Sequence, residues 1–566
     1  MDKLMHHHLT LRAKIIIMIS VMASMFLVAL DQMVISTSLG KIVEEFNAFS
    51  LLGWVITAYM ITTTIMVPIA GKLSDMFGRR IILLIGVGIF TLGSFAGGMS
   101  ADINQLIAFR ALQGIGGGII TANAFSIIGD LFAARERGKW QGMIGAVFGL
   151  SSLAGPLIGG YLTEPHNILG LITNWRWTLL VNVPIGIAAF IIIAIYCPTL
   201  KHNRKPVVDY AGAALLAVGL ALLILAIDNT ETILADVINY TGLSVGWLQA
   251  IMFALIGVIL VAFIAVEKRA AEPIVPAYFF KNRNFVLIIT IATLFGSAFL
   301  GSILYLTQFN QQVFGATPTQ SGLMLLPMVG GMTLTSVGVG QLIAKTGKYK
   351  IFMLIGFIIS TIAVFLLTTL NPNSQYIYEA FIIAFIGVGM GVGMPVISLA
   401  VQNEFEQRDL GAATSNSQLF RSIGSTVGVA IFGAILTAGI ASSLGDMSNN
   451  SYIQKLSQSP AASKFGDLNK PDTLLMLNTP SVKQVIADQT NSAADKLPPA
   501  IGSKMKDQIK TQQADFAAVI VKAYSDSMHK IFVIASILMA VATALVLLLK
   551  ERVLKSAKPT VTPGEM

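Results

Sequence analysis

The sequence predicts an all-α integral membrane protein with fourteen membrane-spanning helices. Of its 566 residues, 54% are hydrophobic and only 12% are charged, whereas soluble domains carry about 25% charged residues. Apolar runs of roughly 20 residues, the length that crosses a bilayer as a helix, recur along the whole chain. Lysines and arginines collect in every second loop between these runs, as expected when those loops lie in the cytoplasm. These observations exclude an ordinary soluble protein.

Fourteen runs are long enough to span, with edges placed to within a few residues. They are 15–37, 51–71, 81–99, 104–128, 139–163, 176–197, 208–228, 247–267, 285–313, 320–344, 351–370, 376–401, 411–440 and 530–550. With the N-terminus inside, the short outside loops hold only Lys41. The sequence therefore predicts a multi-pass membrane protein with both termini cytoplasmic. The membrane we expect it to occupy is the cytoplasmic (inner) membrane of a bacterium.

Other classes of protein are disfavoured. The net charge is +9. The basic residues behind it are distributed by side of the membrane, so the charge does not indicate binding to nucleic acid. The single Cys197 excludes an intramolecular disulfide and a cysteine metal site. The spans contain no HExxH, GxSxG, P-loop or paired-histidine sequence, so neither an enzyme nor an ATP-driven pump is expected. We expect no catalytic residues, no metal and no cofactor, and a chain that works as a monomer in the lipid bilayer.

The two halves of the chain repeat weakly. GKLSDMFGRRI at 71–81 aligns with GQLIAKTGKYKI at 340–351 if one residue is added near the end. Such duplication is typical of transporters that bind substrate between two bundles. The predicted parts are an N-terminal tail (1–14), a six-helix bundle (15–200), inserted helices 7 and 8 (201–270), a C-terminal bundle (271–440) completed by helix 14 (530–550), an extracytoplasmic loop (441–529) and a C-terminal tail (551–566).

The short basic turn at 71–80 carries a specific motif. Its two glycines are expected to let one helix end and the next begin, and its basic residues place it in the cytoplasm. The pattern G-x-L-x-D-x-x-G-R-R is matched by Gly71, Leu73, Asp75, Gly78, Arg79 and Arg80. In this the sequence resembles the major facilitator superfamily. The resemblance implies the major facilitator fold, two six-helix bundles, here with an inserted two-helix hairpin.

Asp75 is an acid inside this basic turn and needs a partner. Arg135 and Arg137 in the next basic loop are candidates. So is the start of the thirteenth span at 409–414, because a helix N-terminus carries partial positive charge. Such a contact would join the two halves at the cytoplasmic side and favour the outward-facing state. We therefore predict a conformational latch formed by Gly71, Asp75, Gly78, Arg79 and Arg80.

Two ionisable residues lie inside the spans of the first half. Asp31 and Arg110 are each six residues from the outer end of their spans, so both lie roughly 9 Å below that edge at about 1.5 Å per residue. Charges at this depth are costly and usually functional. Equal depth and opposite charge predict an ion pair, either static or coupled to proton transport. Glu404 and Glu406, at a cytoplasmic helix end, are instead expected to be solvated.

The sequence around Asp31 and Arg110 resembles that of fourteen-helix drug/proton antiporters. LDQMVISTSL, which holds Asp31, is similar to their first-helix motif, and the fourth-helix motif R-x-x-Q-G-x-G is matched by Arg110, Gln113, Gly114 and Gly116. The resemblance implies that Asp31 and Arg110 couple transport to protons. We hypothesise that proton and substrate compete for the carboxylate of Asp31.

The fifth span is rich in glycine. Gly145 and Gly149 alone would be explained by close helix packing in lipid. Together with a Gly-Pro pair they resemble the antiporter motif that this family associates with export, matched by Gly145, Gly149, Gly155, Pro156, Gly159 and Gly160. WRWTLLVNVPIG at 175–186 is similar to the start of the sixth helix in the same exporters.

A substrate cavity between the halves is expected to hold aromatic and amide side chains. Aromatic rings attract lipophilic cations, although packing toward the bilayer is an equally open explanation for each residue. The predicted lining residues are Trp54, Tyr59, Gln113, Tyr305, Gln308, Phe309 and Gln418.

The sequence thus predicts a proton-coupled antiporter that exports lipophilic or amphiphilic compounds by alternating access, driven by the proton gradient. An exporter of lipid, glycolipid or siderophore on the same fold is the alternative. The segment 441–529, with possible amphipathic helices near 480–495 and 501–525, is either a spacer, or a lid or surface for an envelope partner. Deleting 450–520 should spare a drug pump and disable a lipid exporter that depends on the segment.

Overall fold

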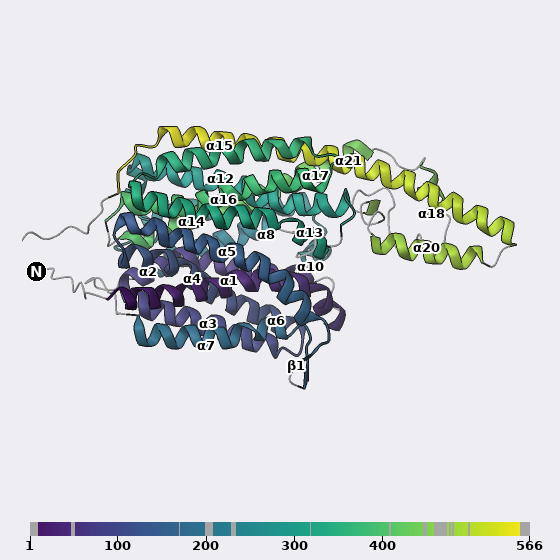
Figure 1. Ribbon diagram of the computed structural model, residues 1–566. Coiled ribbons are helices and arrows are strands. Elements are labelled where there is room, and N and C mark those ends of the chain that lie inside the picture. Colours follow the sequence, from purple (N-terminus) through teal and green to yellow (C-terminus); the bar gives the residue numbers. More distant parts are fainter. Residues whose placement is uncertain are drawn as a thin grey trace, which may run out of the picture.

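The structure, a computed structural model, consists almost entirely of α-helices (Figure 1). It describes residues 10–46, 51–168, 170–197, 208–227, 234–316, 318–406, 409–444, 450–457, 473–474, 477, 480–495 and 498–554; the outermost parts of both predicted tails lie outside these ranges. Fourteen of the described helices are long and apolar enough to cross a membrane, which confirms the fourteen predicted spans.

The first six spans form the N-terminal bundle around their own apolar core. Its elements are α1 (Leu11–Phe46), α2 (Leu52–Phe77), α3 (Arg79–Gly98), α4 (Ile103–Leu131), α5 (Ala134–Thr163), the short strands β1 (Asn167–Ile168) and β2 (Leu171–Ile172), α6 (Trp177–Leu180) and α7 (Asn182–Tyr196). The two strands pair as a small antiparallel hairpin. The sixth span is divided at Val181, because Pro184 has no N–H to donate to the carbonyl of Leu180.

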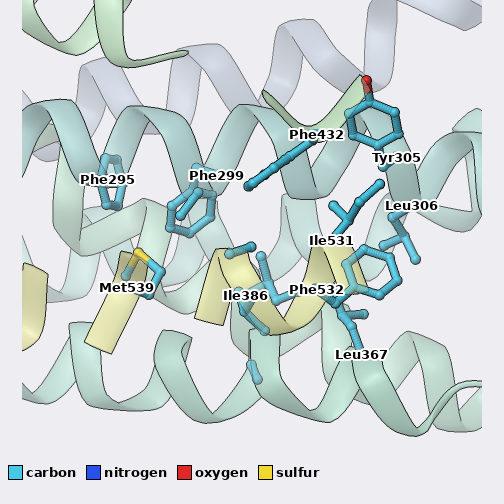
Figure 2. Close-up of a cluster of buried hydrophobic side chains, with 14 of the residues drawn as sticks. Phe295, Phe299, Tyr305, Leu306, Leu367, Ile386, Phe432, Ile531, Phe532 and Met539 are labelled. Carbon is cyan, nitrogen blue, oxygen red and sulfur yellow. The ribbon is translucent and has the colours of Figure 1, made fainter. Parts of the chain in front are cut away.

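The C-terminal bundle has a second apolar core, part of which Figure 2 shows around Phe299, Phe432 and Phe532. Its elements are η2 (Ala277–Lys281), α12 (Arg283–Gln312), α13 (Pro318–Met324), α14 (Leu326–Thr346), α15 (Lys350–Leu366), η3 (Leu367–Thr369), α16 (Tyr376–Glu404), α17 (Leu410–Leu444) and the second half of α21 (Pro499–Leu548).

The inserted hairpin lies outside the two bundles. It comprises α8 (Tyr210–Ile227), α10 (Ala235–Thr241) and α11 (Val245–Glu267). Helix α8 packs on α11 and also against α2 and α17, at the seam between the bundles. Helix α11 exposes Trp247, Val258 and Val261, as expected for a helix whose outer face meets lipid tails.

The segment 441–529 is helical where the structure describes it. It contains α18 (Ser451–Ser457), α20 (Pro480–Ala494) and the first half of α21, close to the two amphipathic helices that the sequence predicts. The predicted boundary at 530 is not a break, because α21 continues through it without a glycine or proline after Gly502. At about 1.5 Å per residue this 50-residue helix is roughly 75 Å long, and α20 and α21 project beyond the bundles (Figure 1).

The turn at 71–80 and its repeat near 347 each contain a glycine with positive φ, although ψ differs, at 142° for Gly78 and 4° for Gly347. Gly78 joins α2 to α3 with φ 99°, and Gly347 ends α14 with φ 71°, values that glycine adopts at little cost. We call this end of the molecule the turn end. The last described segment also lies there, since Leu554 N donates to Gly347 O at 2.9 Å.

Two other repeated glycines mark close crossings between the bundles. Gly71 was expected to end a helix, but it lies inside α2, where a Cβ would stand 2.1 Å from Ser415 Oγ on α17. Its counterpart Gly340 lies inside α14, where a Cβ would stand 2.5 Å from Gly138 O on α5. Both positions need glycine because a neighbouring helix approaches, and not because the chain turns there.

Candidate functional site

Asp31 on α1 and Arg110 on α4 form a buried ion pair. Arg110 Nη1 lies 2.6 Å from Asp31 Oδ2, and each residue is only 1% exposed. The pair agrees with the equal depth inferred from the sequence. Removing one partner would leave an uncompensated buried charge, at a cost of about 3–5 kcal/mol.

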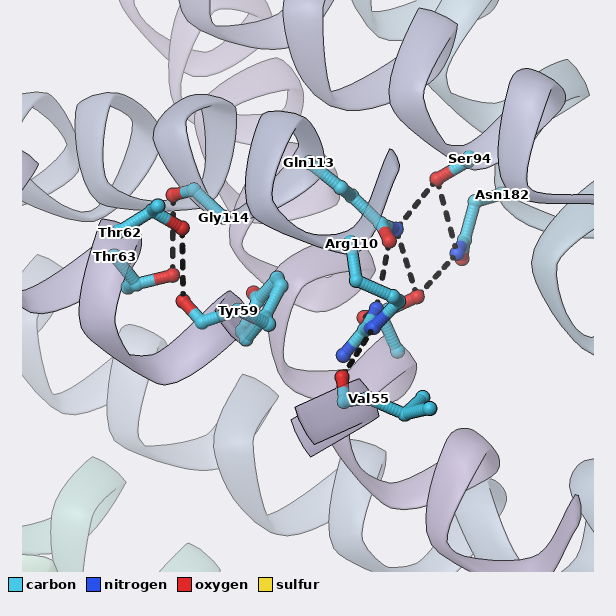
Figure 3. Close-up of polar contacts among 10 residues, drawn as sticks. Val55, Tyr59, Thr62, Thr63, Ser94, Arg110, Gln113, Gly114 and Asn182 are labelled. Carbon is cyan, nitrogen blue, oxygen red and sulfur yellow. Dashed lines mark hydrogen bonds and ion pairs between the residues drawn. The ribbon is translucent and has the colours of Figure 1, made fainter. Parts of the chain in front are cut away.

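Neutral side chains complete the surroundings of the carboxylate (Figure 3). Gln113 Oε1 accepts a hydrogen bond from Arg110 at 2.6 Å, and Gln113 Nε2 donates to Asp31 Oδ1 at 2.8 Å. Asn182 Nδ2 donates to the same oxygen at 2.9 Å. Ser94 Oγ accepts from Gln113 at 2.6 Å and so orients its amide. Helices α1, α3, α4 and α7 all contribute to this network.

The far side of the guanidinium is held by α2. Arg110 Nε donates to the backbone carbonyl of Val55 at 3.3 Å. The centre of the guanidinium lies 4.3 Å from the centroid of the Tyr59 ring, within the range of a cation–π interaction. Tyr59 therefore belongs to this network and is fully buried.

Three donors from two other helices hold the carboxylate of Asp31. It accepts hydrogen bonds from Arg110, Gln113 and Asn182, which occupy three of the about four lone-pair sites of an ionised carboxylate. Any movement of α4 or α7 away from α1 would therefore break at least one of these bonds. The role of the pair in proton coupling stays a prediction.

Sequence reasoning missed two members of the network and assigned two others, Gln113 and Tyr59, to a substrate cavity. Gln113 was predicted to line a substrate cavity, but it lies between the two charges. Asn182 was not predicted; its only signal is Pro184, which breaks the sixth span beside it. Ser94 lies in an ordinary apolar run of α3 and gives no signal.

A second buried cluster of charges lies at the turn end. Arg79 Nε, at the start of α3, lies 2.7 Å from Asp130 Oδ2 on α4. The same guanidinium pairs with Asp75 and donates to Ser74 Oγ, both on α2. All three charged residues are buried. One guanidinium thus joins the ends of α2, α3 and α4.

Asp75 extends this cluster to the C-terminal bundle. Its Oδ2 accepts a hydrogen bond of 2.9 Å from Ala412 N, in the first turn of α17. The side chain of Asp75 therefore faces the positive end of a helix dipole. This contact lies in the 409–414 segment that the sequence offered as a partner.

The other basic residues near the turn have different partners. Arg137 donates to two backbone carbonyls at the end of α4. Neither Arg137 nor Arg135 forms an ion pair with Asp75, because Arg79 already occupies the carboxylate from the same turn. Arg80 was predicted to belong to the latch, but it donates to Ala194 O on α7 and so acts within its own bundle.

A buried pair of glutamines also joins the bundles near the turn end. Gln141 Nε2 on α5 donates to Gln402 Oε1 on α16 at 3.0 Å, and Gln402 Nε2 donates to Phe125 O on α4 at 2.9 Å. Both side chains are buried. Neither was singled out from the sequence, because a glutamine beside a cytoplasmic loop is expected to be solvated.

The glycines of α5 serve two interfaces. A Cβ at Gly145 would stand 2.3 Å from Ser336 Oγ, and one at Gly149 would stand 2.4 Å from Thr333 Oγ1, both on α14 of the other bundle. A Cβ at Gly155 would instead stand 2.2 Å from Met33 Cβ on α1. The first part of the motif therefore packs between bundles, and the later part packs within one.

The end of the motif is less crowded. The carbonyl of Gly159 accepts from Thr163 Oγ1 at 2.6 Å. A Cβ at Gly160 would have no other atom within 4 Å. The side chain of Pro156 lies outside the described part of the structure.

Three predicted cavity residues point into the C-terminal bundle instead. Tyr305 donates to Val429 O on α17 at 3.1 Å, and Gln308 Oε1 accepts from Tyr524 on α21 at 2.8 Å. Phe309 is fully buried in the apolar core. These side chains on α12 therefore face α17 and α21. The buried face of α12 is wide, and it includes these residues along with those of the apolar core.

The remaining two residues are separate from this group. Gln418 Oε1, on α17, accepts from Arg421 at 3.3 Å, and Trp54 is half-buried on α2. The seven predicted lining residues are thus divided between the ion-pair network, the C-terminal core and the two facing helices α2 and α17.

Comparison with known proteins identifies similar chains. The profile of the family described as Major Facilitator Superfamily matches residues 21–429. The multidrug transporter protein MdtP of Bacillus subtilis is 35% identical over 548 residues, which cover 94% of this chain and 93% of that protein. Multidrug resistance protein 3 of the same organism is 35% identical over 453 residues, covering 80% of this chain and 85% of that protein.

A solved structure shares the fold. The human organic anion transporter MFSD10 superimposes with a TM-score of 0.56 over 75% of this chain and 93% of its own, at 15% sequence identity. At this identity the likeness concerns the arrangement of helices alone. It supports the two-bundle architecture described above.

Proposed function

The chain belongs to the Major Facilitator Superfamily, and from this premise we propose that it exports amphiphilic compounds across the cytoplasmic membrane of a bacterium in exchange for protons. Its likeness to two transporters named for multidrug transport supports an efflux role. The substrate class is lipophilic or amphiphilic small molecules, and the fold implies alternating access between the two bundles.

The observation that carries this proposal is the buried carboxylate of Asp31 with its three donors. In the proposed cycle a proton from outside binds Asp31 and displaces Arg110 and the substrate. After the bundles rearrange, the proton leaves to the cytoplasm and substrate binds again. A gradient of one pH unit supplies about 1.36 kcal/mol per proton, enough for a roughly tenfold substrate gradient in one-to-one exchange.

The contacts at the turn end support an outward-facing conformation. The Asp75–Ala412 bond, the Gln141–Gln402 pair and the glycine crossings all join the bundles near that end. If the turn end is cytoplasmic, as its basic residues favour, then the cytoplasmic side is the closed one. The 71–80 turn would act as a latch that must open before substrate enters from inside.

Proteoliposomes test the exchange directly. With the lumen acidified by one pH unit, purified protein should accumulate a fluorescent amphiphile about tenfold, and Asp31→Asn should abolish that accumulation. Asp515→Asn, the same chemical change at an exposed site on α21, is the matched control and should transport normally. Accumulation that does not depend on the pH gradient, or that persists in Asp31→Asn, would show that transport is not an exchange for protons.

The alternative is an exporter of lipid, glycolipid or siderophore that uses the 441–529 segment. The helical extension of α20 and α21 favours a structured role for that segment. However, the alignment with the multidrug transporter MdtP leaves out only 6% of this chain, less than the segment itself. Deletion of 450–520 separates the two functions: drug efflux should persist, and export of a lipid that needs the segment should stop.

A further inference from the structure

A second acid is buried in the C-terminal bundle. Glu379 lies three residues after the start of α16, at the end of the molecule opposite the turn end. It is 0% exposed, and neither carboxyl oxygen has a hydrogen-bond partner among the described residues. Asp31, by contrast, accepts hydrogen bonds from three donors.

The neighbours of Glu379 are neutral. Asn310 on α12 faces the carboxyl, and it is itself fully buried with neither amide atom bonded. Tyr376, one turn earlier on α16, is the titratable group that interacts with the carboxyl; its hydroxyl donates to Met324 O at 3.1 Å. Within the described residues, no lysine, arginine or histidine of α5, α12, α14, α15 or α17, the helices packed against α16, forms an ion pair with Glu379.

An ionised carboxylate is not stable in such surroundings. Burying an unpaired charge costs several kcal/mol even after the protein relaxes, and a carboxyl group avoids this cost by binding a proton. A protonated carboxyl is both donor and acceptor, and so is the amide of Asn310. A small side-chain rotation would then let Glu379 and Asn310 exchange two hydrogen bonds. These bonds would give a partner to both carboxyl oxygens of Glu379 and to both amide atoms of Asn310.

We propose that Glu379 is a second proton-binding site, which holds a proton while α12 and α16 are packed together and exchanges it with the outer solution when these two helices of the C-terminal bundle separate. When they separate, the carboxylic acid gives its proton to water and becomes a hydrated carboxylate; when they pack together again, a proton from outside returns. The site differs from Asp31 in bundle, in partners and in charge state. Its part in the transport cycle rests on the proton exchange proposed above.

Infrared spectroscopy tests the proton directly. The full-length protein near neutral pH should show the C=O stretch of a protonated carboxylic acid. That band should persist in Asp31→Asn and be lost in Glu379→Gln. A wild-type protein without the band, or a Glu379→Gln variant that keeps it, would overturn the proposal.

Asn310→Ala provides a second test if Glu379→Gln fails to fold. It leaves the acid in place and removes the amide, so the C=O band should remain and move to higher frequency as its hydrogen bond is lost. An unshifted band would show that Asn310 is not the partner, which contradicts the site as described. These measurements need no transport, so they stand apart from the test of proton-driven efflux.

The role in the cycle has its own readout. Glutamine imitates the protonated acid, so the part of the outer-pH dependence of efflux that Glu379 contributes should disappear in Glu379→Gln, and only the dependence due to Asp31 should remain. A profile that superimposes on that of the wild type would exclude Glu379 from the cycle. If efflux by the wild type ignores protons altogether, the proposed function fails, while the infrared band still decides whether Glu379 holds a proton.

Discussion

Asp75 of the N-terminal bundle accepts a 2.9 Å hydrogen bond from the backbone amide of Ala412 in the C-terminal bundle. The first amides of a helix have no intrahelical acceptor, so this N–H finds an acceptor only while the bundles touch. Gly71, one turn before Asp75, lets α2 approach α17 closely enough for the bond to form. The motif around the 71–80 turn thus combines an acceptor with the space that brings it to its donor.

Asp75→Ala should weaken the closed state of the turn end. A hydrogen bond to a charged group contributes about 1.5–3 kcal/mol, and 1.4 kcal/mol corresponds to a tenfold change in an equilibrium. Spin-label distances between the ends of α2 and α17 should therefore shift toward the open population by tenfold or more, and transport should slow without a change in its pH dependence.

Ser74→Ala is the control for this prediction. It removes a partner of Arg79 in the same turn but leaves the bond between bundles, so the distances should stay close to those of the wild type. A distance distribution that is unchanged in Asp75→Ala, or a large change in pH dependence, would contradict the latch.

The Asp31–Arg110 pair can be tested as a structural or a coupling element. Asp31→Asn strands a buried guanidinium and should lower the free energy of unfolding by about 3–5 kcal/mol. The double variant Asp31→Asn/Arg110→Gln removes both charges and should recover most of that loss in thermal melting experiments. Proton-driven transport should be absent from both variants.

The double variant decides between the two roles. If the pair only stabilises the bundle, recovery of stability should bring recovery of transport. Stability that returns without proton-driven transport would instead place the carboxylate in the coupling step.

The sequence predicted the scaffold well because its signals are local. Apolar length and the side preference of basic residues act span by span, and the structure contains all fourteen helices. Asp31 and Arg110 could also be paired, since helical rise converts position into depth. The contact of Asn182 with Asp31 could not be predicted, because the position of Asn182 depends on a break in the sixth span and on how α7 packs against α1.

The surroundings of Glu404 also could not be predicted from the sequence. It was expected to be solvated at a helix end, but its side chain is buried and accepts hydrogen bonds from Asn282 at 3.1 Å and from Asn284 at 2.8 Å. Arg552, in the segment after α21, lies 3.4 Å from the carboxylate. These partners come from distant parts of the chain, and no local pattern reveals that they converge. The positions of the predicted cavity residues on α12 were wrong for a similar reason, since the sequence does not show which face of α12 meets its own bundle.

The loop after the inserted hairpin contacts both bundles at the turn end. Lys72 Nζ on α2 lies 2.6 Å from Glu272 Oε2, and Asn416 Nδ2 on α17 donates to Ile274 O at 3.1 Å. Glu272→Gln should have a small and salt-sensitive effect on melting temperature, because its carboxylate is partly exposed. Asn416→Ala should cost more, about 1–3 kcal/mol, because it strands a buried carbonyl. Equal losses, or a larger one in Glu272→Gln, would mean that the ion pair dominates this contact.

Helix α5 provides a matched pair of glycines for testing the seam between the bundles. Gly145→Ala places a methyl group 2.3 Å from Ser336 Oγ, whereas Gly160→Ala places one where no other atom lies within 4 Å. Alanine favours a helix over glycine by about 1 kcal/mol, so Gly160→Ala should be neutral or slightly stabilising. Gly145→Ala must displace the Ser336 hydroxyl from its hydrogen bond to Gly391 O or push α5 away from α14, and it should therefore shift the spin-label distance between these helices and reduce efflux several-fold. Because both variants make the same chemical change in the same helix, a difference between them reports the seam alone, and equal activity of the two would show that close approach of α5 to α14 is not required for transport.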